Sequence, residues 1–250
     1  MAGLIYLTLN FAPQRLAVLL PDEWSRRVGE QMEASLVQNA RACQTPGGDR
    51  AIAAMLASLA DGNPDMPPLR VRVYDIPIMN AFALPGGHVV LTRGLLKEAT
   101  EPGEVAGVLA HEVGHVWHHH PEEQMIRIAG MQVLISVATG TSGGNNTSSL
   151  AGLAAILKSS RDAEREADAY AAAMLSAARI DPMGLKTFFE KILKDEGKAT
   201  GEAFSNLGTV FSTHPITTER IERIKPLPAD VTPRLPLPEA QWKDLKGISG

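Results

Sequence analysis

Residues 104–120 read EVAGVLAHEVGHVWHHH and contain the motif His111-Glu112-Val113-Gly114-His115. Apolar side chains recur through this stretch at helical spacing, at Val105, Val108, Leu109, Val113 and Val116. Residues four apart on a helix lie on one face, so the imidazoles of His111 and His115 project side by side. Two such imidazoles can share one zinc ion, and Glu112 is placed to hold and deprotonate a metal-bound water. The stretch therefore predicts a zinc site on an apolar helix.

The composition is that of an ordinary globular protein, with 44% hydrophobic and 21% charged residues in a chain of 250. This length is enough for one large domain or two small ones with a substantial core. The net charge of −4 gives no reason to expect a nucleic-acid partner. The single cysteine, Cys43, excludes an internal disulfide and a cysteine-based zinc site.

The N-terminal segment, residues 1–20, is apolar and leaves two interpretations open. Within GLIYLTLNFAPQRLAVLL, the polar or helix-breaking residues Asn10, Pro13, Gln14 and Arg15 interrupt the apolar run, so it falls short of a transmembrane helix. The segment also lacks the basic start and small-residue cleavage site of a signal peptide. It is either the remnant of a membrane anchor or an amphipathic first helix.

Helical patterns surround a short β region. The expected helices cover residues 21–42, 50–60, 100–121, 122–139, 150–178, 182–194 and 215–225. The uncharged linker GTSGGNNTSS, residues 140–149, is expected to be a mobile lid or a disordered loop. Residues 226–250 form a proline-rich tail that is expected to run extended over the surface.

The β region consists of one strand and a hairpin directly before the zinc helix. Residues 69–75 (LRVRVYD) alternate apolar and polar side chains, which predicts a half-buried strand. In residues 80–92 (NAFALPGGHVVLT), two apolar runs flank Pro-Gly-Gly, a pattern typical of a hairpin. An exposed edge strand here could pair with an extended peptide backbone, whereas the alternative is an ordinary hairpin that covers the core.

The segment SRDAEREAD, residues 160–168, supplies the best candidate for a third metal ligand. Some zinc proteins use a third histidine at the position that Pro121 occupies here, so that pattern is excluded. Others use a Glu about two dozen residues after the second histidine, and this pattern is excluded because residues 134–146 contain no Glu. Glu164 and Asp168 are four apart on a helix face that alanine and leucine side chains turn inward. Buried carboxylates need a metal or hydrogen-bond partners, so we expect Glu164 to bind the metal and Asp168 to support a ligand imidazole.

Two further polar groups near the motif are expected to be ordinary surface groups. His118, His119 and His120 end the zinc helix, where cationic side chains are favoured. His118 and His119 lie near the faces of the motif histidines, but three ligands are already supplied. Glu166 lies on another face of its helix from Glu164 and is expected to be solvated.

Four motifs in a fixed order resemble one family. HEVGH, the upstream NAFALPGG, SRDAEREAD, and Thr213-His214-Pro215 followed by Arg220 resemble the HtpX, BepA and CAAX-protease family of gluzincin zinc metallopeptidases. The resemblance is closest to the BepA-like bacterial branch and covers residues 20–225. With the periodicities above, it predicts an α+β fold, in which a mostly helical zincin domain (residues 21–225) carries a small β-sheet or hairpin beside the zinc helix.

The family pattern implies roles for particular residues of the core motifs. His111, His115 and Glu164 match the ligands of one Zn²⁺ per chain, and Glu112 matches the catalytic base. Asp168 matches an aspartate that lies behind the ligands.

Other residues match the family pattern outside the core motifs. His214 matches a histidine that either stabilises the oxyanion or takes the water position as a fourth ligand that shuts the enzyme off. Arg220 matches an arginine that pairs with acidic groups behind the metal. The segment that leads into the substrate-facing edge strand corresponds to Asn80, Ala81, Phe82, Ala83, Gly86 and Gly87.

The resemblance also implies an activity and a setting. The expected function is zinc-dependent endoproteolysis of unfolded or extended polypeptide in membrane or envelope protein quality control. Residues 1–20 would associate with a membrane or a membrane protein, at the periplasmic face of a bacterial inner membrane. The alternative is a latched, zinc-containing chaperone-like module with little or no proteolysis. The chain departs from many relatives because it has no full membrane span, and from BepA because its tail has no tetratricopeptide-like repeats.

Overall fold

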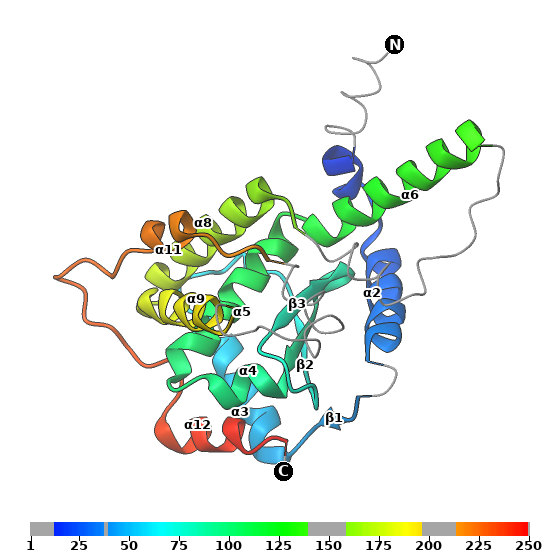
Figure 1. Ribbon diagram of the computed structural model, residues 1–250. Coiled ribbons are helices and arrows are strands. Elements are labelled where there is room, and N and C mark those ends of the chain that lie inside the picture. Colours follow the sequence, from blue (N-terminus) through cyan, green and yellow to red (C-terminus); the bar gives the residue numbers. More distant parts are fainter. Residues whose placement is uncertain (1–12, 38–39, 140–158, 197–213, 250) are drawn as a thin grey trace.

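The computed structural model describes residues 13–37, 40–139, 159–196 and 214–249. Within these ranges, helices surround a small four-stranded sheet (Figure 1), which confirms the predicted mostly helical α+β fold. The lid expected at residues 140–149 lies outside the described part of the chain. Among the helices of the described ranges, none combines the length and the apolarity that crossing a membrane requires.

The sheet has the order β1-β2-β4-β3, so β3 is an edge strand. Its strands are β1 (Ala42–Cys43), β2 (Arg70–Tyr74), β3 (Ala81–Leu84) and β4 (His88–Thr92). The predicted hairpin is confirmed, because β3 and β4 pair antiparallel across the 3-10 turn η1 (Pro85–Gly87). In this turn Gly86 has a φ of 69°, in the left-handed region that glycine adopts without strain. β4 pairs parallel with β2.

The helices follow most of the predicted ranges to within a few residues. They are α2 (Asp22–Leu36), α3 (Pro46–Ala60), α4 (Arg93–Glu98), α5 (Pro102–Trp117), α6 (His120–Thr139), α8 (Arg161–Ala177), α9 (Met183–Glu196), α11 (Thr218–Arg223) and α12 (Glu239–Lys246). α5 carries the HEVGH motif and is central, because it packs against α8, α9 and β3. Its apolar residues are buried all around the helix, which explains its near-continuous hydrophobic sequence.

Several predicted helix boundaries are wrong. The helix expected over residues 21–42 ends at Leu36, and strand β1 begins at Ala42. The zinc helix was expected to run to Pro121, but α5 ends at Trp117 and His119 adopts the left-handed region at a φ of 55°. A new helix, α6, then begins at His120. The single helix expected over residues 150–178 does not hold either, because α8 begins at Arg161 after the non-helical Ser160. The Ser160 side chain accepts a hydrogen bond from the Ala163 amide and so caps the new helix.

The C-terminal residues complete the core, which corrects the expectation of an extended surface tail. Residues beyond Leu237 form α12, and this helix packs on α3. Leu237, Leu245 and Ile248 are 1–2% exposed. The Lys246 ammonium donates hydrogen bonds to three carbonyls at the end of α4, where a cation is electrostatically favoured. The apolar face of α3 therefore has a helical partner that proline content alone did not reveal.

Candidate metal centre

Side chains from three parts of the chain converge beside α5. His111 and His115 come from α5, Glu164 comes from the first turn of α8, and His214 lies shortly before α11. The Nε2 atoms of the two α5 histidines are 3.1 Å apart. Carboxylate oxygens of Glu164 lie 3.4 Å from His111 Nε2 and 3.6 Å from His115 Nε2. His111, His115 and Glu164 are each 1–3% exposed.

This donor set fits a divalent metal ion. Ligand atoms held at about 2.0–2.1 Å around a tetrahedral zinc lie roughly 3.3 Å from one another. The three distances between the ring nitrogens of His111 and His115 and the Glu164 oxygens match that spacing. Two neutral imidazoles facing each other can form only one hydrogen bond, whereas a shared cation satisfies both lone pairs and neutralises the buried carboxylate.

The motif glycine lets the two ligand-bearing helices approach closely. A Cβ atom added to Gly114 would lie 2.8 Å from both Cα and O of Ala167 on α8. Such distances are well inside van der Waals contact, so any side chain at position 114 would push α8 away. Glu164 lies one turn before Ala167, and its distance to the histidines depends on this contact.

A charged network holds the ligands from behind. The Nδ1 of His111 lies 3.0 Å from Asp168 Oδ1. Arg220 donates to both oxygens of Asp168, at 2.7 and 2.8 Å, and its Nη1 lies 2.7 Å from Glu164 Oε2. Burial disfavours the charged form of Asp168, but the bonds from Arg220 and His111 outweigh it and lower the pKa of this carboxyl. The guanidinium also lies 4.6 Å above the ring centre of Phe189, which fixes its plane.

Glu112 lies beside the ligands and is poorly satisfied by the protein. The side chain is 2% exposed, and its Oε2 has no hydrogen-bond partner among the described residues. Its other oxygen, Oε1, lies 3.7 Å from His214 Nε2. A buried carboxylate oxygen without a partner is costly, and at functional sites such a group often serves a ligand or water.

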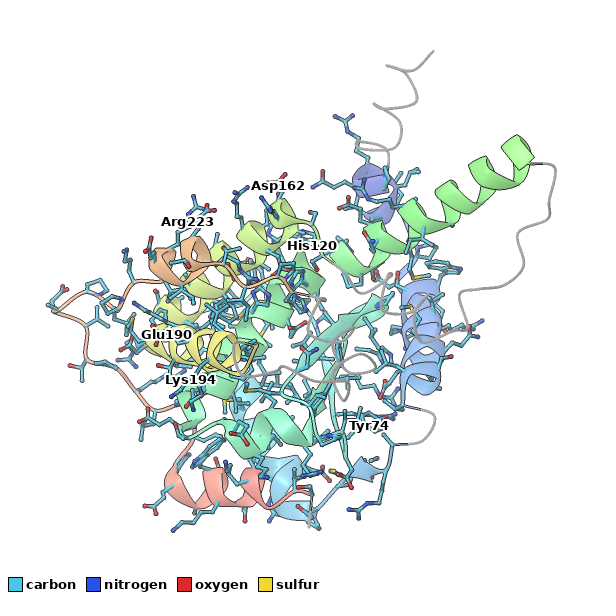
Figure 2. All side chains as sticks on the ribbon, viewed as in Figure 1. Tyr74, His120, Asp162, Glu190, Lys194 and Arg223 are labelled. Atoms are coloured by element: carbon cyan, nitrogen blue, oxygen red, sulfur yellow. The ribbon has the colours of Figure 1, made fainter. Side chains whose placement is uncertain are left out.

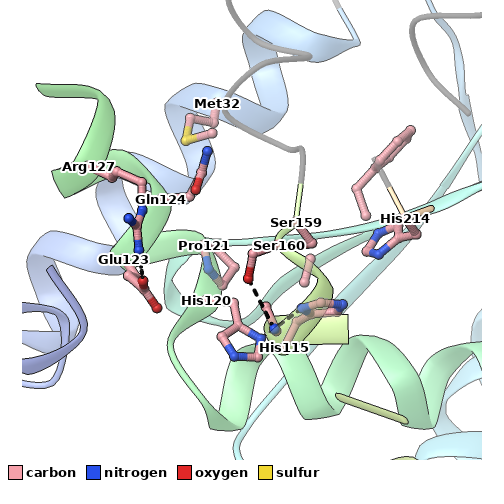
Figure 3. Close-up of a pocket in the computed structure, with 13 residues that line it drawn as sticks. Met32, His115, His120, Pro121, Glu123, Gln124, Arg127, Ser159, Ser160 and His214 are labelled. Atoms are coloured by element: carbon pink, nitrogen blue, oxygen red, sulfur yellow. Dashed lines mark hydrogen bonds and ion pairs between the residues drawn. The ribbon is translucent and has the colours of Figure 1, made fainter. Parts of the chain in front are cut away.

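His214 also belongs to this group of side chains. Its Nδ1 lies 2.9 Å from Glu164 Oε1, and its ring centre lies 5.3 and 4.9 Å from those of His111 and His115. The ligand atoms that these three histidines and Glu164 could offer all lie within 4.8 Å of one another. Figure 3 shows His214 and His115 lining one pocket.

The structure corrects the expectation that His120 is an ordinary surface group, whereas Glu166 is exposed as expected and contacts His120. His120 is 7% exposed, its Nδ1 lies 2.9 Å from His115 Nδ1, and its Nε2 lies 3.0 Å from Glu166 Oε2. Helical periodicity could not predict these contacts, because they require the chain to turn at His119. On a continuous helix, residues five apart point about 140° apart, so His120 would have faced away from His115.

The candidate substrate strand reaches the site over part of its length. Asn80 and Ala81 line a pocket with His111 and Glu112, and Phe82 and Ala83 line the pocket that includes His115. Gly86 and Gly87 line neither pocket. A Cβ at Gly86 would collide with the α2 backbone, and one at Gly87 would collide with the Pro68 carbonyl, so close packing accounts for these glycines.

An HEVGH helix that meets a glutamate from a later helix defines a metallopeptidase of the zincin class. Residues 48–227 match the model of Peptidase family M48. The chain belongs to this family of zinc metallopeptidases, which confirms the class predicted from the four motifs.

Individual relatives are also metalloproteases by name. The chain is 32% identical to Metalloprotease LoiP of Escherichia coli over 177 residues, which cover 68% of this chain and 67% of LoiP. It is 35% identical to the mitochondrial metalloendopeptidase OMA1 of Arabidopsis thaliana over 150 residues, 60% of this chain and 30% of OMA1. It is 30% identical to the beta-barrel assembly-enhancing protease of Escherichia coli over 162 residues, 57% of this chain and 31% of that protein.

Proposed function

We propose that this chain is a zinc-dependent endopeptidase that hydrolyses unfolded or extended polypeptide. The observation that carries the proposal is the convergence of His111, His115 and Glu164 at ligand spacing, next to the unpaired oxygen of Glu112. One Zn²⁺ per chain fits two imidazoles and one carboxylate, and the absence of a cysteine ligand favours a catalytic over a structural site. Bound zinc supplies a Lewis acid for the scissile carbonyl and for water.

Extended substrate fits the edge strand beside the metal ligands. The pockets on the two sides of the histidines are both lined by β3 or the residues just before it. A peptide that adds to β3 would run across His111 and His115 and place alternate side chains in these pockets. Addition of a strand requires a backbone free of its own structure, so unfolded segments would be preferred over folded domains.

Glu112 would act as the general base and acid of the reaction. Its unpaired Oε2 accepts the proton of the attacking water and returns it to the amine of the leaving peptide. Arg220 and Asp168 hold the ligands and keep the negative charge of Glu164 in place. His214, whose Nε2 lies 3.7 Å from Glu112 Oε1, would donate a hydrogen bond to the oxyanion.

The proposal is tested by casein degradation with zinc-loaded protein, comparing the wild type with Glu112→Gln. Gln keeps the size of the side chain but cannot accept the proton, so we expect a loss of turnover of about 10²- to 10⁴-fold. Zinc content, measured by atomic absorption, should stay at the wild-type value. Retained cleavage by the variant would rule out Glu112 as the base.

A latched form that binds peptide without cutting it is a second candidate. It is favoured by one observation, the position of His214 among the atoms that could bind a single ion. Failure of wild-type protein to cleave casein, with zinc bound, would support this form. His214→Ala separates the roles, because cleavage should rise if His214 latches the metal and fall if it holds the oxyanion.

We also propose membrane association through residues 1–20, in a bacterial envelope at the periplasmic face of the inner membrane. In the described part of this segment, Leu16, Val18 and Leu19 are 47%, 58% and 75% exposed. Apolar side chains left open to water in this way suit a membrane or a membrane protein. Unchanged sedimentation with lipid vesicles after Leu16→Ser and Leu19→Ser would contradict this assignment.

A further inference from the structure

His120 is a buried imidazole placed between a candidate zinc ligand and a carboxylate. It begins α6 and turns back toward α5 because His119 adopts the left-handed region. Figure 3 shows His120 next to His115, and the His120 side chain is buried. Neither of its ring nitrogens is free, since one faces His115 Nδ1 at 2.9 Å and the other faces Glu166 Oε2 at 3.0 Å.

The positions of the protons follow from these two contacts. His115 directs its Nε2 toward His111 and Glu164, so a metal would bind at that nitrogen. A neutral imidazole that gives Nε2 to a metal carries its proton on Nδ1 and donates from there. The facing Nδ1 of His120 must then accept, which leaves the His120 proton on Nε2, pointing at Glu166. Each contact then has one donor and one acceptor.

We infer that His120 and Glu166 form a positioning pair that fixes the tautomer and the ring orientation of His115. Asp168 occupies the equivalent place behind His111, at 3.0 Å from its Nδ1. Both histidines of the motif are thus held through Nδ1, one directly by a carboxylate and one through an interposed imidazole. This inference rests on the proposed zinc site, and partners of this kind strengthen metal binding by orienting the ligand.

A second metal ion at His118, His120 and Glu166 is a weaker interpretation of the same cluster. The possible ligand atoms of these residues do lie within 4.8 Å of one another. In that case a metal would occupy Nε2 of both His115 and His120. The two facing Nδ1 atoms, 2.9 Å apart, could then share only one proton. Either His115 or His120 would then have to exist as an imidazolate, which is unfavourable near neutral pH.

The test measures the zinc dissociation constant by competition with a chromophoric chelator. His120→Asn places an amide oxygen near the position of Nδ1 and can still accept from His115, whereas His120→Phe keeps an aromatic ring without an acceptor. We expect His120→Phe to weaken zinc binding about 10- to 100-fold and His120→Asn to stay within about threefold of the wild type. The matched control is His119→Asn, because Asn tolerates the left-handed conformation at that position.

Equal zinc affinities for His120→Phe and His120→Asn would overturn the inference, whether both fall or both stay unchanged. The proposed zinc site is judged separately, by whether the wild type binds one zinc ion per chain. If the wild type binds no zinc, the proposed function fails. If it binds zinc and the two variants do not differ, only the positioning pair fails.

Variants of Glu166 test the same inference without touching the interior, because its side chain is 44% exposed. Glu166→Gln keeps an acceptor oxygen for His120, whereas Glu166→Lys presents a donor. The lysine ammonium would donate to His120 Nε2, so the His120 proton would move to Nδ1 and face the proton on His115 Nδ1. Zinc affinity should then fall about 10-fold or more. Asp162→Lys makes the same charge change on the exposed start of α8 (Figure 2) and should have little effect. Equal effects of the two lysine variants would overturn the inference.

Discussion

Gly114 shows how one residue of the motif controls the distance between two helices. It contributes no side chain to the site, yet it permits the contact with Ala167 that brings the start of α8 to the histidines. Gly107 lies seven residues earlier on the same helix, where a Cβ would meet Leu185 at 2.7 Å. Two glycines on nearly the same face of α5, two turns apart, therefore allow close contact with α8 and with α9.

Gly114→Ala tests this contact at the scale of a single methyl group. The added Cβ must displace α8 and Glu164, so we expect about 1–3 kcal/mol of lost stability and weaker zinc binding. Thermal unfolding and chelator competition measure the two effects. Gly103→Ala is the control on the same helix, since its Cβ would meet nothing within 4 Å. Similar losses in both variants would show that the α5–α8 contact is not responsible.

At the scale of secondary structure, the start of the zinc helix depends on a buried carboxylate. Glu104 is 2% exposed and accepts hydrogen bonds from the hydroxyl and amide of Thr100, at 2.6 and 3.0 Å. Lys191 of α9 lies 2.6 Å from its other oxygen and ties the two helices together. Burial disfavours ionisation of Glu104, but the bonds from Lys191 and Thr100 outweigh it and lower its pKa.

A lowered pKa in the folded state means that the ionised Glu104 stabilises the fold. This contribution is fully present above the ordinary value of 4.5 and is lost as the pH falls through the folded-state pKa. Glu104→Gln should therefore lower the free energy of unfolding by about 2 kcal/mol at pH 7, with a smaller difference from the wild type below pH 4.5. Urea titrations over this pH range measure it.

The control for Glu104 is the solvent-exposed pair of α12, Glu239 and Lys243. Their side chains are 80% and 74% exposed, so Glu239→Gln should change stability by less than about 0.5 kcal/mol at any pH. A pH-independent effect of Glu104→Gln would contradict the assignment of its charge to helix stabilisation.

At the scale of the whole molecule, the C-terminal helix closes a core that the rest of the chain leaves open. Leu245 on α12 is 1% exposed and belongs to the same apolar cluster as residues of α3 and α5. Leu245→Ala should destabilise the fold by about 2–4 kcal/mol, because it removes buried methyl groups and leaves a cavity. Leu235→Ala is the comparison, since Leu235 is 73% exposed. Equal thermal unfolding midpoints for the two variants would show that α12 is dispensable to the core.

The periodicity of the sequence determined the elements and the class of the protein. The helical spacing of HEVGH, the turn residues between β3 and β4 and the paired carboxylates of SRDAEREAD act over a few residues, where backbone geometry decides which side chains share a face. Glu164 and Asp168 lie close to His111 on the helix face that was expected to point inward, because alanine side chains line that face.

Only the tertiary structure decided the features that depend on a change of chain direction or on a distant partner. His120 reaches His115 because a single residue, His119, leaves the right-handed helical region, and few non-glycine residues adopt that conformation. α12 is buried because α3 presents an apolar face to it, although the preceding prolines suggested an exposed tail. Local sequence specifies which face of an element is apolar, but what covers that face is set by packing between segments far apart in the chain.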